Sequence, residues 1–263
     1  MNIKLVLLST LLSLNLFSSS SFTGSSMSEY ASNLNTKEYD WYYESRNNGE
    51  PPLSPKETRD IISKYPVYYL GNTDKKVIYL TFDEGYENGY TERILDILKK
   101  HKVPAAFFVV EPYIKSNPEI VKRMEAEGHL VCNHSAHHPS MASVLDLEKF
   151  KIELQEVEKV YKEVTGKDIA KFFRPPMGKY SELSLKYTTD LGYKTIFWSF
   201  AYRDWIPEEQ PSHDFAMNKI VNKTHNGAII LLHAVSKTNA EILDQLITKW
   251  KADGYEIKSL EEL

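Results

Sequence analysis

From residue 67 onward the chain alternates short apolar segments with longer segments that are apolar on one face only. The short segments are rich in β-branched and aromatic residues, a composition typical of buried β-strands. The longer segments repeat apolar residues every three or four positions, which predicts amphipathic helices. The pattern therefore predicts strands at residues 77–82, 105–110, 129–133, 171–174, 193–198, 228–232 and 256–259, and helices at residues 89–101, 118–127, 146–165, 181–191, 213–224 and 238–253.

The helix expected at residues 146–165 has the clearest pattern. One apolar stripe runs along an otherwise charged segment that ends at Gly166, and it is formed by Leu147, Phe150, Leu154, Val157, Tyr161 and Val164. Repeated strand and helix units of this spacing imply parallel strands joined by right-handed crossovers. Seven strands favour an α/β fold with a closed or nearly closed barrel, and an open doubly wound sheet is the alternative.

The first 66 residues have a different character. Lys4, the leucine-rich residues 5–17 and the small polar residues 18–26 form the pattern of a signal peptide. The apolar part is shorter than the roughly 20 residues of a membrane-spanning helix, so we expect export, with an uncleaved anchor as the alternative. No Cys lies nearby to carry a lipid anchor. We therefore expect a signal or anchor at residues 1–24, an extended N-terminal arm at 25–66 with a short helix near 55–65, and one main domain at 67–263.

Composition narrows the range of partners. The net charge is −4 and charges of both signs are well mixed, so we expect no nucleic-acid partner. The single Cys132 excludes an internal disulfide, and its apolar neighbours predict an inert buried thiol.

The strand at residues 77–82 stops abruptly at two adjacent carboxylates, Asp83 and Glu84, followed by Gly85. Burying an unpaired acid costs several kcal/mol, of order ~5, so a chain keeps one there mainly for function. A strict pleat would aim the two carboxylates at opposite faces, but Gly85 lets the backbone turn, and we expect both to face one cleft. Asp83 is the candidate catalytic base.

Two histidines four residues apart, His134 and His138, would share one face of a helical turn and can bind one metal ion. Two histidines and one carboxylate leave a fourth position for water on Zn²⁺. The alternative for this pair is a capping or core role. We expect His137 to point away and to be structural.

Other polar residues follow later strands. Arg174 is held by two prolines and can pair with Asp83, Asp204 can hold a catalytic histidine, and His233 follows an apolar strand as a candidate general acid. Each has an ordinary structural alternative, such as a surface arginine or a hydrogen-bonded core histidine. The carboxyl ends of barrel strands carry the chemistry in barrel enzymes, so we expect these groups to meet there.

The motifs TFDEG, HSAHH, RPPMG, RDW and LLH together resemble, in order, the five motifs of the polysaccharide deacetylases with the NodB homology domain, carbohydrate esterase family 4. The resemblance covers about residues 68–263. It is strongest to the branch that deacetylates N-acetylmuramic acid in peptidoglycan on the way to muramic δ-lactam in the spore cortex, through YLGNT, YLTFDEGYENGYT, FWSFAYRDW and LLHAVSKTNAE. The resemblance implies a distorted (β/α)₇ barrel.

The resemblance also implies roles for individual residues. Asp83 would be the base, paired with Arg174, and His233 the acid, tuned by Asp204. His134 and His138 would be metal ligands together with Glu84. The remaining roles concern the substrate: the backbone N–H of Met177 would bind the oxyanion, and Trp205 and Leu231 would line the acetyl pocket.

Two positions depart from the family pattern. Glu84 stands where the family usually has a metal-binding Asp, and its extra methylene lets it ligate, reach through water or turn away. Ala201 replaces an acid that is common in the fourth motif. These departures leave open both the affinity for the metal and its identity, with zinc as the expected ion.

We therefore expect an exported, monomeric, metal-dependent hydrolase that acts on peptidoglycan glycan strands in the cell wall or spore cortex. One alternative is a glycan-binding pseudoenzyme of the same fold. Another is a deacetylase or esterase acting on chitin-like or other acetylated sugars, which would share every catalytic residue. Arg203 is a candidate partner of the lactyl carboxylate of muramic acid, with a solvated surface arginine as the alternative.

Overall fold

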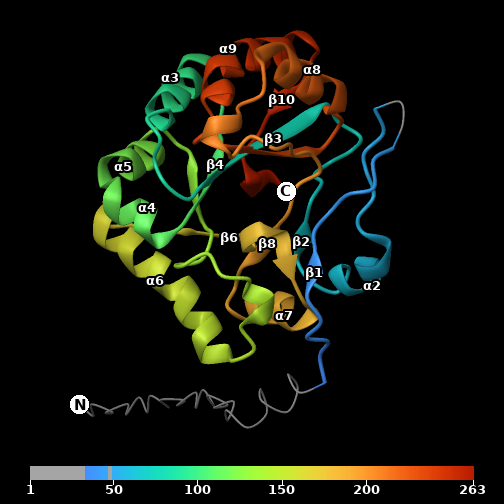
Figure 1. The fold of residues 1–263 in the computed structure, drawn as a ribbon, viewed down its shortest axis with the longest axis vertical. Helices are drawn as coiled ribbons and strands as arrows, with labels where there is room; N and C mark the ends of the chain where they lie inside the picture. Colours follow the sequence, from blue (N-terminus) through green and yellow to red (C-terminus); the bar gives the residue numbers. More distant parts are fainter. Residues whose placement is uncertain (1–32, 47–48) are drawn as a thin grey trace, which may run out of the picture. The chain divides into compact units, whose positions relative to one another are not determined.

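The computed structural model describes residues 33–46 and 49–263, so the expected signal or anchor segment lies outside the described residues. The helices and strands that it describes belong to one compact unit, Asn35–Leu263. In this unit, helices surround a ring of strands (Figure 1). Within the described ranges, no helix is both long enough and apolar enough to cross a membrane.

The main sheet has eight strands, and all of its strand pairs are parallel. They are β2 (Val67–Tyr68), β3 (Val77–Glu84), β4 (Ala106–Val109), β5 (Leu130–Asn133), β6 (Ala170–Phe173), β8 (Lys194–Ile196), β9 (Ala228–His233) and β10 (Glu256–Ile257). The order is β10-β3-β4-β5-β6-β8-β2, with β9 beside β3. Bridges from Leu70 to Ala228 and from Phe200 to Ile230 connect the two ends, so the sheet curls. This confirms the expected α/β fold with a distorted barrel rather than an open sheet.

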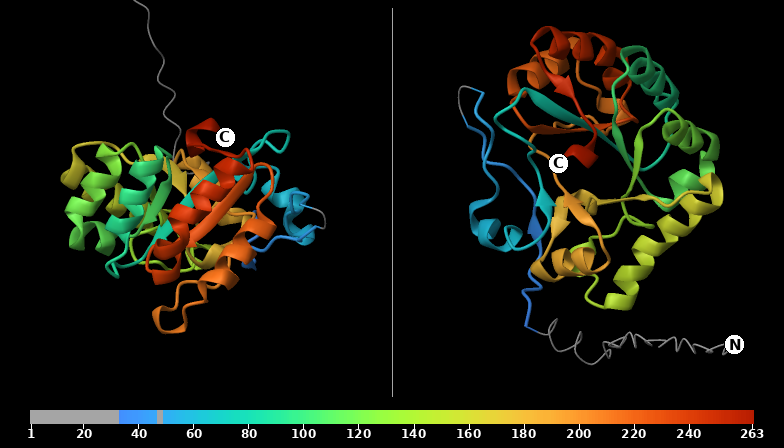
Figure 2. Two further views of the ribbon diagram at one scale, coloured as in Figure 1. Left: turned by 90° about the horizontal axis from the view of Figure 1, so that it is seen from above. Right: turned by 180° about the vertical axis from the view of Figure 1, so that it is seen from behind.

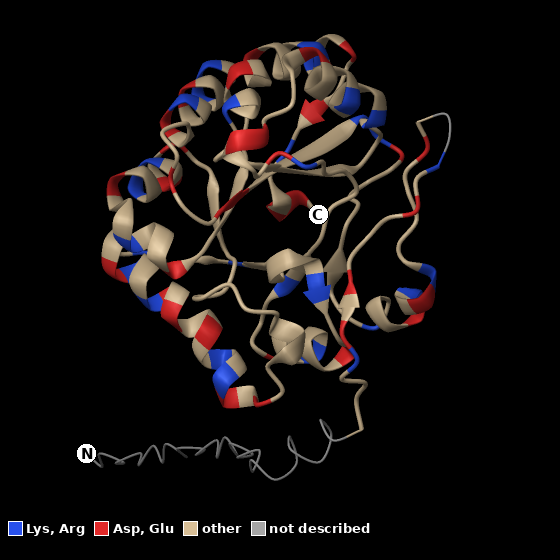
Figure 3. Cartoon of the chain, in the orientation of Figure 1, with Lys and Arg blue, Asp and Glu red and all other residues tan. Residues whose placement is uncertain are grey.

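The helices lie outside this curled sheet, as the view from behind also shows (Figure 2). They are α2 (Arg59–Ile62), α3 (Thr91–His101), α4 (Glu111–Ser116), α5 (Pro118–Ala126), α6 (Leu147–Thr165), α7 (Glu182–Asp190), α8 (His213–Lys223) and α9 (Lys237–Ala252). Short 3₁₀ turns lie at η1 (Lys56–Thr58), η2 (Met141–Ser143), η3 (Pro176–Gly178), η4 (Pro207–Glu209) and η5 (Leu260–Glu262). Acidic and basic residues are interleaved along the outer helices, which agrees with the mixed charge of the sequence (Figure 3).

Most of the expected elements are present, with boundaries that differ by a few residues. Helix α6 begins after Asp146, whose carboxylate accepts a hydrogen bond from the N–H of Lys149, and it ends at Gly166 in the left-handed region. The sequence pattern missed α4, which is only six residues long. It also missed a small antiparallel pair outside the main sheet, formed by β1 (Tyr39–Asp40) in the arm and β7 (Lys179–Tyr180).

The two faces of β3 belong to different cores. Val77 and Tyr79 pack in a cluster inside the curled sheet with side chains from β4, β5, β6, β8 and β9. Ile78, Leu80 and Phe82 pack in a larger cluster with residues of the surrounding helices. Side chains alternate along a strand, so every second residue of β3 faces the interior of the barrel.

Candidate active site

One cavity of about 480 Å³ lies at the carboxyl ends of the barrel strands. It is lined by Asp83, His134, His138, Met177, Gly178, Trp198, Ala201, Tyr202, Arg203, Trp205, Leu231 and His233. Most of the residues that the sequence indicated are therefore brought together. Arg174 and Asp204 are buried behind this lining: Arg174 contacts Asp83 and His134, and Asp204 contacts His233. Glu84 is not part of the lining.

Asp83 lies at the end of β3 on the face that points into the barrel. Its Oδ1 accepts a hydrogen bond from Nη1 of Arg174 at 2.6 Å, and the Arg174 side chain is fully buried. The guanidinium also donates to the hydroxyl of Thr81 at 2.9 Å and to the carbonyl of Ile196 at 3.2 Å, and it lies 4.1 Å from the ring centre of Phe108. These contacts fix the orientation of the Arg174 guanidinium group, which in turn orients the Asp83 carboxylate.

The surroundings of Asp83 keep it ionised. Burial by itself raises the pKa of the Asp83 carboxyl. The positive charge of Arg174, with further contributions from His134 and His233, outweighs burial and holds this pKa below its ordinary value. A carboxylate that stays charged at neutral pH can accept a proton, as a general base must.

His134 follows β5 and is oriented by a backbone carbonyl. Its Nδ1 lies 2.8 Å from the carbonyl oxygen of Arg174, which can only accept, so Nδ1 carries the proton and Nε2 is left with a lone pair. Burial lowers the pKa of His134 to about 4, so the ring is neutral at neutral pH. Its Nε2 lies 3.5 Å from Oδ2 of Asp83, and these two acceptors face each other.

His138 joins His134 at the cavity, but not through a helix. Ser135 and His138 both have positive φ angles, 67° and 57°, and the N–H of His138 donates to the hydroxyl of Ser135. This tight loop still brings the two rings together, with centres 4.9 Å apart. The expectation of a shared helical face is therefore wrong, although the pairing of the rings is as expected. His137 points away and binds Glu153.

Glu84 does not share the cleft with Asp83, contrary to our expectation. β3 stays pleated through Glu84, so this side chain continues the outward-facing series of Ile78, Leu80 and Phe82. It is fully buried, and neither carboxylate oxygen has a hydrogen-bond partner. Burial, together with the charges of Glu87 and Asp83, raises the pKa of Glu84 well above its ordinary value. Among the described residues, no group of three or more His, Cys, Asp or Glu side chains is arranged to hold a metal ion.

His233 ends β9 and forms a close pair with Asp204. Its Nδ1 lies 2.7 Å from Oδ1 of Asp204, and its backbone N–H donates to Oδ2 at 2.9 Å. Burial by itself lowers the pKa of His233, but the charge and hydrogen bond of Asp204 and the charge of Asp83 outweigh it and raise the pKa. The imidazolium form therefore persists above the usual pH range of histidine, which suits a general acid.

Asn239 hydrogen-bonds to both Asp204 and His233, and the sequence analysis did not assign it a role. Its Nδ2 donates to Oδ2 of Asp204 at 2.6 Å and to the carbonyl of His233 at 3.2 Å, while the hydroxyl of Tyr202 donates to its Oδ1. Asn239 is held in the first turn of α9 because its N–H binds the hydroxyl of Ser236, the N-cap. The only sequence signal for this role is its place in the motif after LLH.

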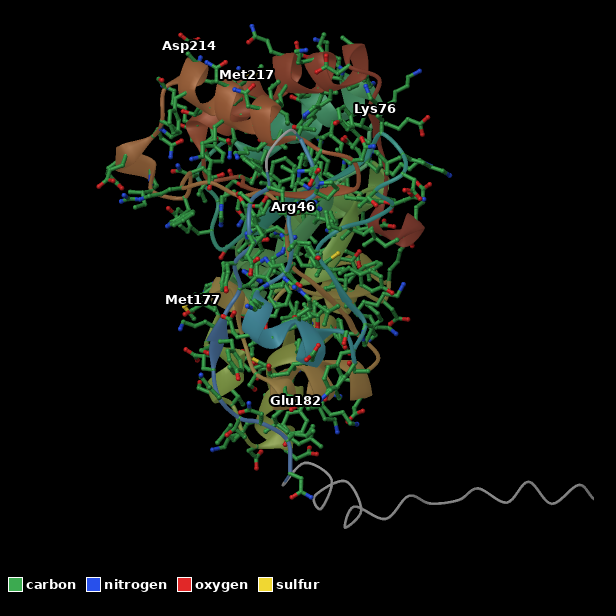
Figure 4. The ribbon with its side chains drawn as sticks, turned by 90° about the vertical axis from the view of Figure 1, so that its right-hand side faces the viewer. Arg46, Lys76, Met177, Glu182, Asp214 and Met217 are labelled. Atoms are coloured by element: carbon green, nitrogen blue, oxygen red, sulfur yellow. The ribbon has the colours of Figure 1, made fainter. Side chains whose placement is uncertain are left out.

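The residues expected to bind substrate lie at the rim and wall of the cavity. Met177 has a positive φ of 58°, unusual for a non-glycine residue, and its side chain is exposed at the edge of the molecule (Figure 4). Trp205 is half-exposed, with its ring centre 5.4 Å from that of His233. Leu231 is buried in the wall. Together they place apolar surface beside the proposed acid.

The remaining nucleophilic and imidazole groups lie outside the cavity. Cys132 is fully buried, which confirms the prediction of a buried thiol, and burial raises the pKa of this thiol. His101 and His213 pair with acids distant in sequence, Asp244 and Glu241, and these pairings could not be foreseen from local spacing.

Comparisons with known proteins agree with this geometry. A family model described as polysaccharide deacetylase matches residues 70–196. The peptidoglycan-N-acetylmuramic acid deacetylase PdaA of Bacillus subtilis is 46% identical over 224 residues, which are 85% of this chain and 84% of PdaA. The solved structure of PdaA, a family 4 carbohydrate esterase, superposes with a TM-score of 0.84 at 44% identity, covering 87% of this chain and 97% of PdaA.

A family 4 pseudoenzyme from Bacillus anthracis is also similar, with a TM-score of 0.70 at 26% identity, covering 91% of this chain and 93% of that one. This fold therefore occurs both in enzymes and in a protein described as a pseudoenzyme. Because the match to PdaA spans most of both chains and the family motifs converge on one cavity, the chain belongs to the polysaccharide deacetylase family, carbohydrate esterase family 4.

Proposed function

We propose that this protein is an exported hydrolase that removes N-acetyl groups from peptidoglycan glycan strands, specifically from N-acetylmuramic acid. One observation carries the proposal: Asp83 and His233 open into the same cavity, and each has a buried counter-ion, so that the pKa of Asp83 is lowered and the pKa of His233 is raised. A protein that only binds glycan has no need of a candidate base and a candidate acid whose pKa values are shifted in opposite directions. The similarity to PdaA supports the muramic acid substrate.

The proposed reaction is hydrolysis of the acetamide bond. Asp83 takes up a proton from the attacking water while the new C–O bond forms, and Arg174 keeps Asp83 charged beforehand. The backbone N–H of Met177 donates to the oxyanion. His233 then protonates the sugar nitrogen as the C–N bond breaks, which releases acetate and a free amine. Trp205 and Leu231 hold the acetyl methyl group.

Two of the three expected metal ligands are placed where they could bind a divalent metal ion. Nε2 of His134 is left with a lone pair because Nδ1 donates to the carbonyl of Arg174, and this is the form of histidine that would bind a metal ion. The ring of His138 lies beside that of His134, so we propose His134 and His138 as the ligands. Glu84, the third expected ligand, lies on the outward face of β3 and does not line the cavity.

A bound zinc or similar ion would act as a Lewis acid that lowers the pKa of water and polarises the acetamide carbonyl. Positioned acid and base groups lower a barrier by about 3–5 kcal/mol, whereas enzymes commonly remove about 8–23 kcal/mol. Asp83 and His233 alone are therefore insufficient, which is why we retain the metal in the proposal.

A second candidate is a glycan-binding pseudoenzyme of the same fold. The outward position of Glu84 favours it, because the site then has fewer protein ligands for a metal. A deacetylase of chitin-like sugars would use the same catalytic groups and differ only in how it recognises the sugar.

The test is acetate release from purified peptidoglycan strands, with and without stem peptides, after chelation and after adding back zinc or other divalent ions. We expect acetate and free amino groups on muramic acid, at least a tenfold loss on chelation and recovery with metal. Binding without release under any metal would establish the pseudoenzyme. Release from glucosamine residues at an equal or higher rate would overturn the muramic acid specificity. Free muramic acid amines carry a neighbouring lactyl carboxylate, so a positive result would also place this protein before δ-lactam closure in cortex synthesis.

A further inference from the structure

The N-terminal arm reaches the loop that carries Met177. β1 of the arm pairs with β7, and β7 begins directly after Gly178, so Tyr39 lies opposite Tyr180 and Asp40 opposite Lys179. The N–H of Trp41 donates to the carbonyl of Gly178 at 2.8 Å. The matched family region begins only at residue 70, so this contact is made by a segment outside it.

Trp41 also packs behind the cavity wall. Its indole N–H donates to the carbonyl of Trp198 at 2.9 Å, and its ring stacks on Phe197 at 4.3 Å with an interplanar angle of 5°. Gly178 is in close contact with this wall, since a Cβ at that position would lie 2.9 Å from the Trp198 ring and 3.2 Å from Cβ of Trp41. Gly178 is therefore packed between the arm and the cavity wall.

Glu38 connects this turn to the histidine loop. One carboxylate oxygen accepts from the hydroxyl of Ser140 at 2.5 Å, and the other pairs with the ammonium of Lys179. Ser140 is two residues after His138, and Lys179 directly follows Gly178. A single side chain of the arm therefore joins two loops that are distant in sequence and that both line the cavity.

Both loops contain a non-glycine residue with left-handed backbone. Met177 and His138 have φ angles of 58° and 57°, a region that non-glycine residues leave unless their surroundings hold them. An error of about 1 Å in the position of an active-site group can reduce turnover about 100-fold.

We propose that Glu38 and Trp41 are positioning residues for the deacetylation reaction: the arm clamps the Met177 turn and the His138 loop at a fixed separation. This inference rests on the proposed function for its kinetic effect, but the clamp itself can be measured independently. Glu38 is partly exposed, so its removal should disturb the loops without unfolding the protein.

The experiment compares Glu38→Ala with Glu57→Ala in the full chain. Glu57 is the matched control because it lies in the same arm and accepts a hydrogen bond from Tyr42 at 2.7 Å without contacting either loop. For Glu38→Ala we expect kcat to fall about tenfold or more, KM to change less than about threefold, and the melting temperature to stay within a few degrees. Glu57→Ala should match the wild type in all three.

Hydrogen exchange gives the second readout. In Glu38→Ala the amides of residues 140–143 and 177–180 should exchange faster than in the wild type, while α6 and α9 remain unchanged. Trp41→Phe keeps an aromatic ring against Phe197 but removes the indole N–H and part of the buried ring. Faster exchange in this variant should be confined to residues 177–180.

A double-mutant cycle of Glu38→Ala and Ser140→Ala should be non-additive in kcat, because both remove the same contact. Unchanged exchange in both loops, or kcat within twofold of the wild type, would overturn the clamp. If the wild type releases no acetate, the proposed function fails, and the exchange measurement still decides whether the arm holds the loops.

Discussion

Asp83 and His233 are register partners on the adjacent parallel strands β3 and β9. Each has its own buried counter-ion, Arg174 for the carboxylate and Asp204 for the imidazole. These separate ion pairs shift the two pKa values in opposite directions, down for Asp83 and up for His233. These shifts favour the ionised form of Asp83 and the protonated form of His233, the forms that a base and an acid need.

Replacing Asp83 tests the proposed base. Asp83→Asn should reduce acetate release by about 10²- to 10⁴-fold, because the amide cannot take up the proton. It should also destabilise the protein by about 2–5 kcal/mol, because it leaves the fully buried Arg174 without a counter-charge. Acetate assays and denaturant unfolding measure the two effects. Release at the normal rate would rule out Asp83 as the base.

The pH profile tests the acid. The folded pKa of His233 is raised, so the protonated form is present at low pH and is lost as the pH rises through that value. In Asp204→Asn the supporting charge is gone, and the alkaline limb of kcat should move to lower pH by about 1–2 units. The Asn amide oxygen can replace only one of the two acceptors of Asp204, and its NH2 group would face a donor, so kcat should also fall. An alkaline limb at the wild-type position would show that His233 is not the group titrating there.

The pH dependence of stability tests whether the Glu84 side chain is buried on the outward face of β3. The pKa of Glu84 is raised in the folded protein. Above about pH 4.3 the unfolded chain therefore loses a proton from Glu84 that the folded chain retains. The free energy of unfolding then falls as the pH rises toward the folded pKa. Glu84→Gln removes this loss. The melting temperature of the variant relative to the wild type should therefore increase from pH 4 to pH 8.

Glu84→Gln also tests whether Glu84 is a metal ligand. A carboxylate that faces away from the cavity should not affect zinc affinity, so calorimetry should give Kd values for Glu84→Gln and the wild type within about twofold. A tenfold or greater loss of affinity, with no gain in stability at high pH, would instead show that Glu84 turns inward to ligate the ion.

Arg203 tests the sugar specificity. It lines the cavity, is largely exposed and pairs with Glu209 at 2.7 Å, so its guanidinium can leave this partner for a substrate carboxylate. Arg203→Ala should lower kcat/KM for muramic acid strands about tenfold and leave glucosamine strands nearly unchanged. Glu209→Gln is the control and should not reduce either rate. An unchanged ratio of the two substrates in Arg203→Ala would contradict the assignment.

Several features could be predicted because they depend on local chemistry. The strand ending at Asp83, the striped helix α6 with its cap at Asp146, and the polar residues after successive strands are all visible in the order of residues. Barrel topology then brings the carboxyl ends of those strands together, so the meeting of Asp83, His134 and His233 followed from the pattern. The N-terminal arm was recognised only as polar and extended, because β1 has no partner until β7 lies beside it.

The sequence by itself determined the α/β class, the five motifs and the residues available for proton transfer, since alternation and strand ends are properties of neighbouring residues. Only the tertiary structure decided which way each side chain faces. The pleat of β3 continued to its last residue and turned Glu84 outward, where Gly85 had suggested a shared cleft. His134 and His138 lie side by side in a loop, not in a helix, because Ser135 and His138 have left-handed backbone conformations. Glu38 contacts Ser140 and Lys179 because folding brings together segments that are more than 100 residues apart in the sequence.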